Sequence, residues 1–270
     1  MQKTFTDQLG RSITINYPPK KIVSLVPSQS ELLVDLGLNN EIIGITKFCI
    51  HPIEKFASCT KVGGTKKLKL DVIRALQPDL IIGNKEENTQ SEIELLMQEF
   101  PVWMSDIANL EDSMRTITQI GELVDRMPEA AYLNHLIQAG FTDLQTLALQ
   151  KKIDKKVAYL IWKDPYMFAG QHTFIDDILR KIGLTNVIEQ SRYPSLDLAQ
   201  LKTVNCDLIF LSSEPYPFKE KHIQEIKAIL PHSKVMLVDG EMFSWYGSRL
   251  VKAVEYLFHL QDEIGGERLT

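Results

Sequence analysis

The amino-acid sequence predicts an α/β protein of two lobes with mostly parallel sheets, joined by a single long α-helix. Short apolar segments alternate with amphipathic ones both before and after residues 128–152, a pattern typical of the strand and helix units of parallel sheets. Residues 128–152 themselves keep a helical period. A phrase of the first half also recurs in the second half, which indicates two lobes built on one plan.

The long helix is predicted from its apolar spacing and from its two ends. Apolar residues recur at Ala130, Leu133, Ile137, Phe141, Leu144 and Ala148. Pro128 suits a first turn, Glu129 lies near the positive end of the helix dipole, and Lys151 and Lys152 lie near its negative end. At about 1.5 Å per residue the helix is roughly 35 Å long, enough to connect two small domains. An ordinary packed helix within one domain is the alternative.

The first half begins with a small hairpin at 5–15 and a buried strand at 22–26. Pro27 then opens a helix in which Ser28 is the expected N-cap and Glu31 completes a capping box. The later elements follow in this order: strand 41–46, turn 62–65, helix 71–76, strand 79–82, helix 91–98, strand 102–104 and helix 110–125. We therefore expect an N-terminal α/β lobe at 1–127, followed by the connecting helix at 128–152.

The second half, expected to form a C-terminal α/β lobe at 153–270, restarts the same alternation. Its elements are expected in this order: strand 157–162, helix 175–182, a short segment at 186–189, helix 198–204, strand 207–211, helix 221–229, strand 234–238 and helix 248–261. Residues 70–86 align without gaps with 198–214, and Glu86 matches Glu214. Each of these acids follows a strand, at the sheet edge where parallel folds bind ligands, so we expect a small-molecule site between the lobes.

Composition excludes several classes of protein. The 270 residues are 44% hydrophobic and 24% charged with a net charge of −5, which describes a globular chain without the basic footprint of a nucleic-acid binder. No stretch is apolar enough for a membrane span, and residues 1–15 lack a secretory signal, so a cytoplasmic location stays open. Three cysteines without a C-x-x-C pair indicate no disulfide framework.

Common catalytic signatures are absent from the sequence, which contains no G-x-S-x-G, Walker, G-x-G-x-x-G or H-E-x-x-H motif. The loop 47–52 instead offers binding groups, since Cys49 and His51 could approach a metal and His172 could join them from the second lobe. A packed thiol and a hydrogen-bonded imidazole are the simpler interpretation of this pair. The remaining histidines are expected to be solvated: His135, His222, His232 and His259.

Aromatic and charged residues gather where the predicted strands end. Clusters of rings close three segments of the second half, with Trp162, Tyr216, Trp245 and Tyr246 as their members of interest. Any one of these rings is more often core than contact, but three clusters in one lobe favour a wide, flat, partly apolar ligand such as a macrocycle.

These motifs make the chain resemble the class III substrate-binding proteins of ABC importers, which bind vitamin B12 and ferric siderophores. The first lobe carries the resemblance in Pro27-Ser28 with Glu31, Val62-Gly63-Gly64 and Ala75 to Leu80, and the second in Ala169-Gly170, Tyr193-Pro194 and Gly247-Ser248-Arg249. Phrases such as Phe48 to Pro52 and Ser213 to Phe218 place it closest to the branch called helical backbone metal receptors.

The resemblance implies two Rossmann-like lobes on one long helix, and a periplasmic or membrane-associated, monomeric, non-catalytic binding protein. It further implies a cobalt- or iron-containing chelate as ligand, no covalent cofactor, no nucleic acid, and an ABC permease as membrane partner. Permease docking would use Asp71 and Asp197. The ligand-binding residues expected are Lys47, His51, Gly64, Glu86, Trp162, Lys163, Glu214, Tyr216, Trp245 and Tyr246, with His51 also the candidate metal ligand.

Three functions follow from these patterns. The first is a receptor that holds a metal chelate or macrocycle between its lobes, with a corrinoid ahead of a ferric siderophore or heme. The second is an intracellular metal-binding or metal-trafficking protein, or an enzyme, that uses Cys49, His51, Glu86 and Glu214. The third is a receptor for a bare divalent cation, in which His51 or His172 would be essential.

Overall fold

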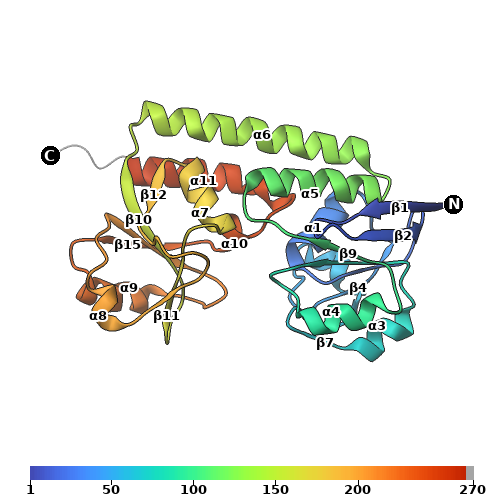
Figure 1. Cartoon of the computed structure of the whole chain (residues 1–270). Coiled ribbons are helices and arrows are strands. Elements are labelled where there is room, and N and C mark those ends of the chain that lie inside the picture. Colours follow the sequence, from blue (N-terminus) through green and yellow to red (C-terminus); the bar gives the residue numbers. More distant parts are fainter. Residues whose placement is uncertain (266–270) are drawn as a thin grey trace. The chain divides into compact units, whose positions relative to one another are not determined.

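The structure is a computed structural model that describes residues 1–265, apart from the side chain of Leu198. Two compact units make up the chain. Unit 1 comprises Met1–Ile107, Glu111–Leu136 and Tyr246–Arg249, and unit 2 comprises Ala108–Leu110, Ile137–Trp245 and the residues from Leu250 onward. Both units combine a mostly parallel sheet with helices, so the predicted α/β class is confirmed (Figure 1).

Unit 1 is built on a five-stranded parallel sheet of order β5-β4-β3-β8-β9. Its strands are β3 (Ile22–Ser24), β4 (Ile42–Ile45), β5 (Thr60–Lys61), β8 (Leu80–Asn84) and β9 (Val102–Ser105). Ile22 pairs with Ile42 on one side and with Leu80 on the other. All residues of β3, β8 and β9 are buried, as expected for parallel strands covered on both faces.

Helices and two small hairpins complete unit 1. The helices are α1 (Pro27–Asp35), α2 (Ile53–Phe56), α3 (Leu70–Leu76), α4 (Gln90–Met97) and α5 (Leu110–Leu123), whose first residue belongs to unit 2. The hairpins are β1 (Gln2–Thr6) with β2 (Ser12–Asn16) and β6 (Gly63–Gly64) with β7 (Lys67–Leu68). The segment 62–65, expected to be a simple turn, therefore begins a hairpin.

Unit 2 contains a six-stranded mixed sheet of order β13-β11-β10-β14-β15, with β12 also paired to β10. The strands are β10 (Lys155–Trp162), β11 (Tyr166–Ala169), β12 (Leu184–Asn186), β13 (Ser195–Leu196), β14 (Leu208–Ser212) and β15 (Lys234–Val238). The helices are α7 (Phe174–Lys181), α8 (Leu198–Leu201), α9 (Glu220–Ile229), α10 (Glu241–Ser244) and α11 (Arg249–Gly265). Strands β11 and β13 pair antiparallel and were missed by the sequence analysis.

The long helix is α6 (Met127–Gln150), close to the predicted 128–152. In unit 1 it packs tightly on α5, because a Cβ on Gly121 would lie 2.4 Å from the Cβ of Ala130. In unit 2 it packs on α11, since a Cβ on Gly140 would lie 2.6 Å from a methyl group of Val254. Close approach of helix backbones thus requires glycine at both positions.

The repeated phrase forms the same helix-to-strand plan in both units. In unit 1, α3 leads into β8, and in unit 2, α8 leads into β14. Both strands pair in parallel with the central strand of their sheet, β3 or β10. Glu86 and Glu214 each follow two residues after their strand, so the expected correspondence of the two acids is confirmed at the level of the backbone.

The capping box expected at the start of α1 is wrong. The N-cap residue is Val26, and no side chain caps the helix. Glu31 instead accepts a hydrogen bond from Nε of Arg249 at 2.8 Å, and both side chains are almost fully buried. The carboxylate of Glu31, which the local motif predicted to cap the helix, therefore pairs with Arg249, 218 residues away in the chain.

Replacing Arg249 with Met should destabilise the protein, because Glu31 keeps its buried charge and loses its counter-ion. Removal of one member of a buried pair costs roughly 3–5 kcal/mol of the free energy of unfolding, which urea denaturation measures. Arg115→Met is the matched control: its ion pair with Asp112 involves an arginine side chain that is 59% exposed, so about 1 kcal/mol or less is expected. Equal losses in the two variants would contradict the assignment. The double variant Glu31→Leu/Arg249→Met should recover part of the loss.

Candidate functional site

The loop after β4 presents an aromatic ring next to a cation. The ammonium of Lys47 lies 4.9 Å from the ring centroid of Phe48, whose side chain is 49% exposed. A Cβ on Gly64 would lie 3.3 Å from Cε2 of Phe48 and 3.5 Å from Cε of Lys47. Glycine at position 64 therefore lets the ring rest on the hairpin backbone. Phe48 was not among the predicted contacts, although its place between Lys47 and Cys49, directly after a buried strand, was a usable signal.

Cys49 lies in the same loop but faces the interior. Its side chain is only 2% exposed, and Sγ lies 3.1 Å from Oγ of Ser30 and 3.3 Å from Oγ1 of Thr46. Burial raises the pKa of the thiol, so the thiolate that a metal requires is disfavoured. His51 is partly exposed on the loop surface. Within residues 1–265 no group of three or more His, Cys, Asp or Glu side chains is placed to hold a metal ion.

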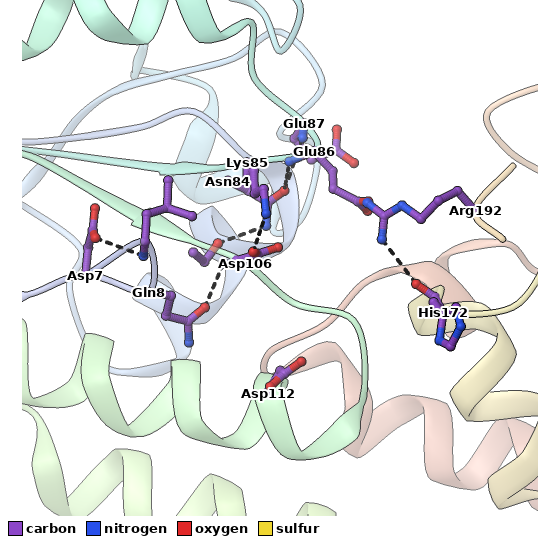
Figure 2. Close-up of polar contacts among 12 residues, drawn as sticks. Asp7, Gln8, Asn84, Lys85, Glu86, Glu87, Asp106, Asp112, His172 and Arg192 are labelled. Atoms are coloured by element: carbon purple, nitrogen blue, oxygen red, sulfur yellow. Dashed lines mark hydrogen bonds and ion pairs between the residues drawn. The ribbon is translucent and has the colours of Figure 1, made fainter. Parts of the chain in front are cut away.

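A hydrogen-bonded loop follows β8 and carries Glu86 and Glu87 (Figure 2). Oδ1 of Asn84 accepts from the backbone amides of Glu86 at 2.8 Å and Glu87 at 3.1 Å. Asn88 fixes the other end, because its Oδ1 accepts from the backbone amide of Asn84 at 2.8 Å. Lys66 donates to the backbone carbonyl of Glu86. The loop is thus held by buried asparagines, which explains why the sequence places Asn on both sides of the two acids.

In unit 2, Trp162 ends β10 with 39% of its surface exposed. Its ring meets Tyr216 edge to face at 5.6 Å, and Tyr216 in turn lies 4.7 Å from Phe218. Trp162 is therefore an accessible ring that Tyr216 supports, and its contact with a ligand stays a prediction.

His222 packs against Tyr216 and Phe218 of this aromatic group. The expectation that His222 is solvated is wrong. It is 3% exposed, its Nδ1 accepts from the backbone amide of Lys219 at 2.8 Å, and its Nε2 lies 3.5 Å from the hydroxyl of Tyr216. The ring also contacts Phe218 at 5.4 Å. Burial lowers the pKa of His222, with smaller contributions from Lys221 and Lys163, so the neutral imidazole caps α9.

Lys163 and Glu214, both expected to contact ligand, make internal bonds. Nζ of Lys163 lies 2.6 Å from Oε1 of Glu225, and this bond raises the pKa of Lys163. Oε1 of Glu214 accepts from Nε1 of Trp245 at 2.9 Å and from Oγ of Ser244 at 2.8 Å. Glu214 thereby holds the indole of Trp245 in place.

The other predicted residues are buried or make contacts of their own. Trp245 and Tyr246 are 9% and 8% exposed, so little of either ring is accessible. His172 accepts at its backbone carbonyl from the guanidinium of Arg192 at 3.1 Å (Figure 2). Asp71 is exposed beside Arg74, at 3.3 Å, and Asp197 accepts from the backbone amide of Gln200 at 2.8 Å. Contact of these residues with a ligand or a permease stays a prediction, as does a ligand position between the units.

What the described groups share is their place at the carboxyl ends of parallel strands. Lys47 and Phe48 follow β4, Glu86 follows β8, and in unit 2 Trp162 ends β10 and Glu214 follows β14. Ligands of parallel sheets bind at this edge. Unit 1 thus places an exposed ring, a cation and a carboxylate at its strand ends, and unit 2 places an exposed ring at the end of β10.

Comparisons with known proteins identify relatives that are binding proteins. A family model described as periplasmic binding protein matches residues 22–229. An uncharacterised ABC transporter substrate-binding lipoprotein of Bacillus subtilis, YvrC, is 26% identical over 94% of this chain and 83% of its own length. The vitamin B12-binding protein of Vibrio campbellii is 26% identical over 73% of this chain and 72% of its own.

Solved structures share the fold. The periplasmic vitamin B12 binding protein of Vibrio cholerae superposes with a TM-score of 0.78 at 18% identity, covering 93% of this chain and 99% of that one. A periplasmic heme binding protein of Pseudomonas aeruginosa gives a TM-score of 0.79 at 17% identity, covering 93% of this chain and 94% of the other. At such low identity these likenesses establish the fold alone.

The stability of the protein should depend on the protonation of His222. Because its pKa is lower in the fold than in the unfolded chain, the unfolded chain takes up the proton first as the pH falls below about 6.5. The free energy of unfolding should then decrease with falling pH until the lowered pKa of the folded state is reached. Urea denaturation across this range should show a weaker pH dependence for His222→Gln. The exposed His135→Gln variant should match the wild type, and an unchanged dependence in His222→Gln would contradict the assignment.

Proposed function

This chain belongs to the periplasmic binding protein family, and we propose that it is the solute-binding protein of an ABC importer for a metal-containing chelate, most specifically a corrinoid. Proteins of this family bind solutes without transforming them, so the chain is not an enzyme. The family expected from the sequence motifs is thereby confirmed. Ferric siderophores and heme rank behind a corrinoid as ligands.

The observation that carries the proposal is the pair of accessible rings at strand ends, Phe48 in unit 1 and Trp162 in unit 2. Both are backed by fixed structure, Phe48 by the hairpin at Gly64 and Trp162 by Tyr216. Rigid rings provide apolar contact area at low entropic cost. In each unit, such a ring suits contact with a ligand that has a flat face, as a corrin or porphyrin has.

Polar side chains at the strand ends of unit 1 match the rim of such a ligand. A corrinoid carries amide groups around its macrocycle, which both donate and accept hydrogen bonds. Lys47 would donate to amide oxygens and Glu86 would accept from amide nitrogens, while the tied loop at Asn84 holds Glu86 in place. His51, which is partly exposed on the loop after β4, would orient or ligate the metal of the chelate. Named relatives that bind vitamin B12 support this choice of ligand.

The alternatives receive less support from the geometry. A metal-trafficking protein or enzyme would need Cys49 as a thiolate, but that side chain is buried and its pKa is raised. A receptor for a bare divalent cation needs several converging ligands, and the described part of the chain contains no such group. A chelate brings its metal already coordinated, so it requires no protein ligand set.

Delivery to a membrane permease would follow from this function, with Asp71 and Asp197 as the docking carboxylates. We expect the protein to lie outside the cytoplasmic membrane, because relatives are named as a lipoprotein and as periplasmic proteins. We also expect it to act as a monomer. No helix among residues 1–265 is long and apolar enough to cross a membrane.

Calorimetric titration of the whole chain with cyanocobalamin, hemin and a ferric siderophore tests the proposal. Cyanocobalamin should bind at micromolar concentration or below. Phe48→Ala and Trp162→Ala should each weaken binding on the order of tenfold, because each removes a large apolar contact. Tyr132→Ala, which removes an exposed ring from α6, is the control and should leave the affinity unchanged. No heat with any of the three ligands would refute the chelate function.

A further inference from the structure

A second surface of unit 1 combines positive charge with exposed aliphatic residues. We name residues 47–69 the basic edge. It contains six lysines and a single acidic residue, Glu54, for a formal charge of +5. The whole chain carries −5, so all other residues together carry −10. The lysines are all exposed: Lys47, Lys55, Lys61, Lys66, Lys67 and Lys69.

The fold brings three of these lysines, Lys61, Lys67 and Lys69, to one border of the sheet. Strand β5 is the last in the order β5-β4-β3-β8-β9, and Lys61 lies on it. The β6-β7 hairpin continues from β5, and the backbone amide of Lys69 donates to the carbonyl of Val62 at 2.8 Å. Lys67 and Lys69 are thereby held close to the strand that carries Lys61.

Two isoleucines project from the same segment. Ile50 is 47% exposed and Ile53 is 66% exposed, while Phe56 of α2 is buried and anchors the segment to the sheet. Large aliphatic side chains at such exposure, in a segment rich in lysine, combine the two elements of an interfacial membrane-binding surface. Isoleucine reaches below the headgroups, and lysine pairs with anionic lipid.

We propose that the basic edge binds an anionic phospholipid surface. Charge complementarity favours lipid over a protein partner, because lysine is depleted from protein interfaces but contributes steadily to binding at anionic bilayers. The charge of −10 on the rest of the chain would be repelled by the same surface, so the molecule would meet the membrane with the basic edge foremost. Binding to lipid would be a function separate from solute binding. The variants that test it leave Lys47 and Phe48 unchanged.

Vesicle sedimentation with the whole chain tests this proposal. The wild type should pellet with vesicles that contain phosphatidylglycerol, should remain in solution with phosphatidylcholine vesicles, and should be released by salt. The triple variant Lys55→Glu/Lys67→Glu/Lys69→Glu should lower the partition coefficient on the order of a hundredfold, since each lysine contributes roughly a fivefold factor. Ile53→Asp should lower it several-fold.

Matched variants in unit 2 make the test specific. Lys152→Glu/Lys202→Glu/Lys227→Glu removes three exposed lysines elsewhere, and Leu149→Asp changes an aliphatic residue that is 80% exposed. Both controls should pellet like the wild type, and the thermal midpoints and cyanocobalamin affinity of all variants should be unchanged. Absence of binding to phosphatidylglycerol vesicles, or equal losses in the two triple variants, would overturn the proposal. Pelleting only with vesicles that hold a permease would also overturn it, and would assign the basic edge to a protein partner.

Discussion

The buried ion pair between Glu31 and Arg249 is the constraint on which unit 1 depends. It joins the first helix to the first residue of the last helix. The residues just before Arg249 are fixed as well, because the backbone amide of Gly247 donates to Oγ of Ser113 in α5 at 3.0 Å. Unit 1 is therefore completed only by residues 246–249, which follow unit 2 in the chain. Burying one charge of this pair without the other is costly. Unit 1 can therefore complete its fold only when residues 246–249 have packed against it.

Most of the fold could be predicted from local pattern. Buried parallel strands and the long helix α6 have periods that the sequence displays directly, and their bounds were close to those observed. The strand β11 was missed because it is short, follows Pro165 and pairs antiparallel beside a parallel sheet. Glu31 was misassigned because its position fits a capping box and its real partner is distant in the chain. Local signals therefore sufficed for elements, and failed where a tertiary contact competed with them.

In the candidate site, too, local pattern identified the loops but not the tertiary contacts of their side chains. Loops 47–52 and 84–88 were found because polar residues after a buried strand have no role in the core. The commitment of Lys163 to Glu225 and of Glu214 to Trp245 could not be seen, since the partners lie 62 and 31 residues away. His222 looked like a surface residue of a helix and instead caps α9 beneath Tyr216. Trp162, the accessible ring of unit 2, therefore rests on side chains that are themselves held by hydrogen bonds and ring contacts.

In the proposed function, fixed, accessible rings and a hydrogen-bonded acidic loop bind a metal-containing macrocycle. Native mass spectrometry of the whole chain, incubated with an equimolar mixture of cyanocobalamin, hemin, a ferric siderophore and zinc chloride, tests it most directly. The expected result is a single added mass equal to one cyanocobalamin. Protein that gains only the mass of zinc, or that gains no mass, would contradict it.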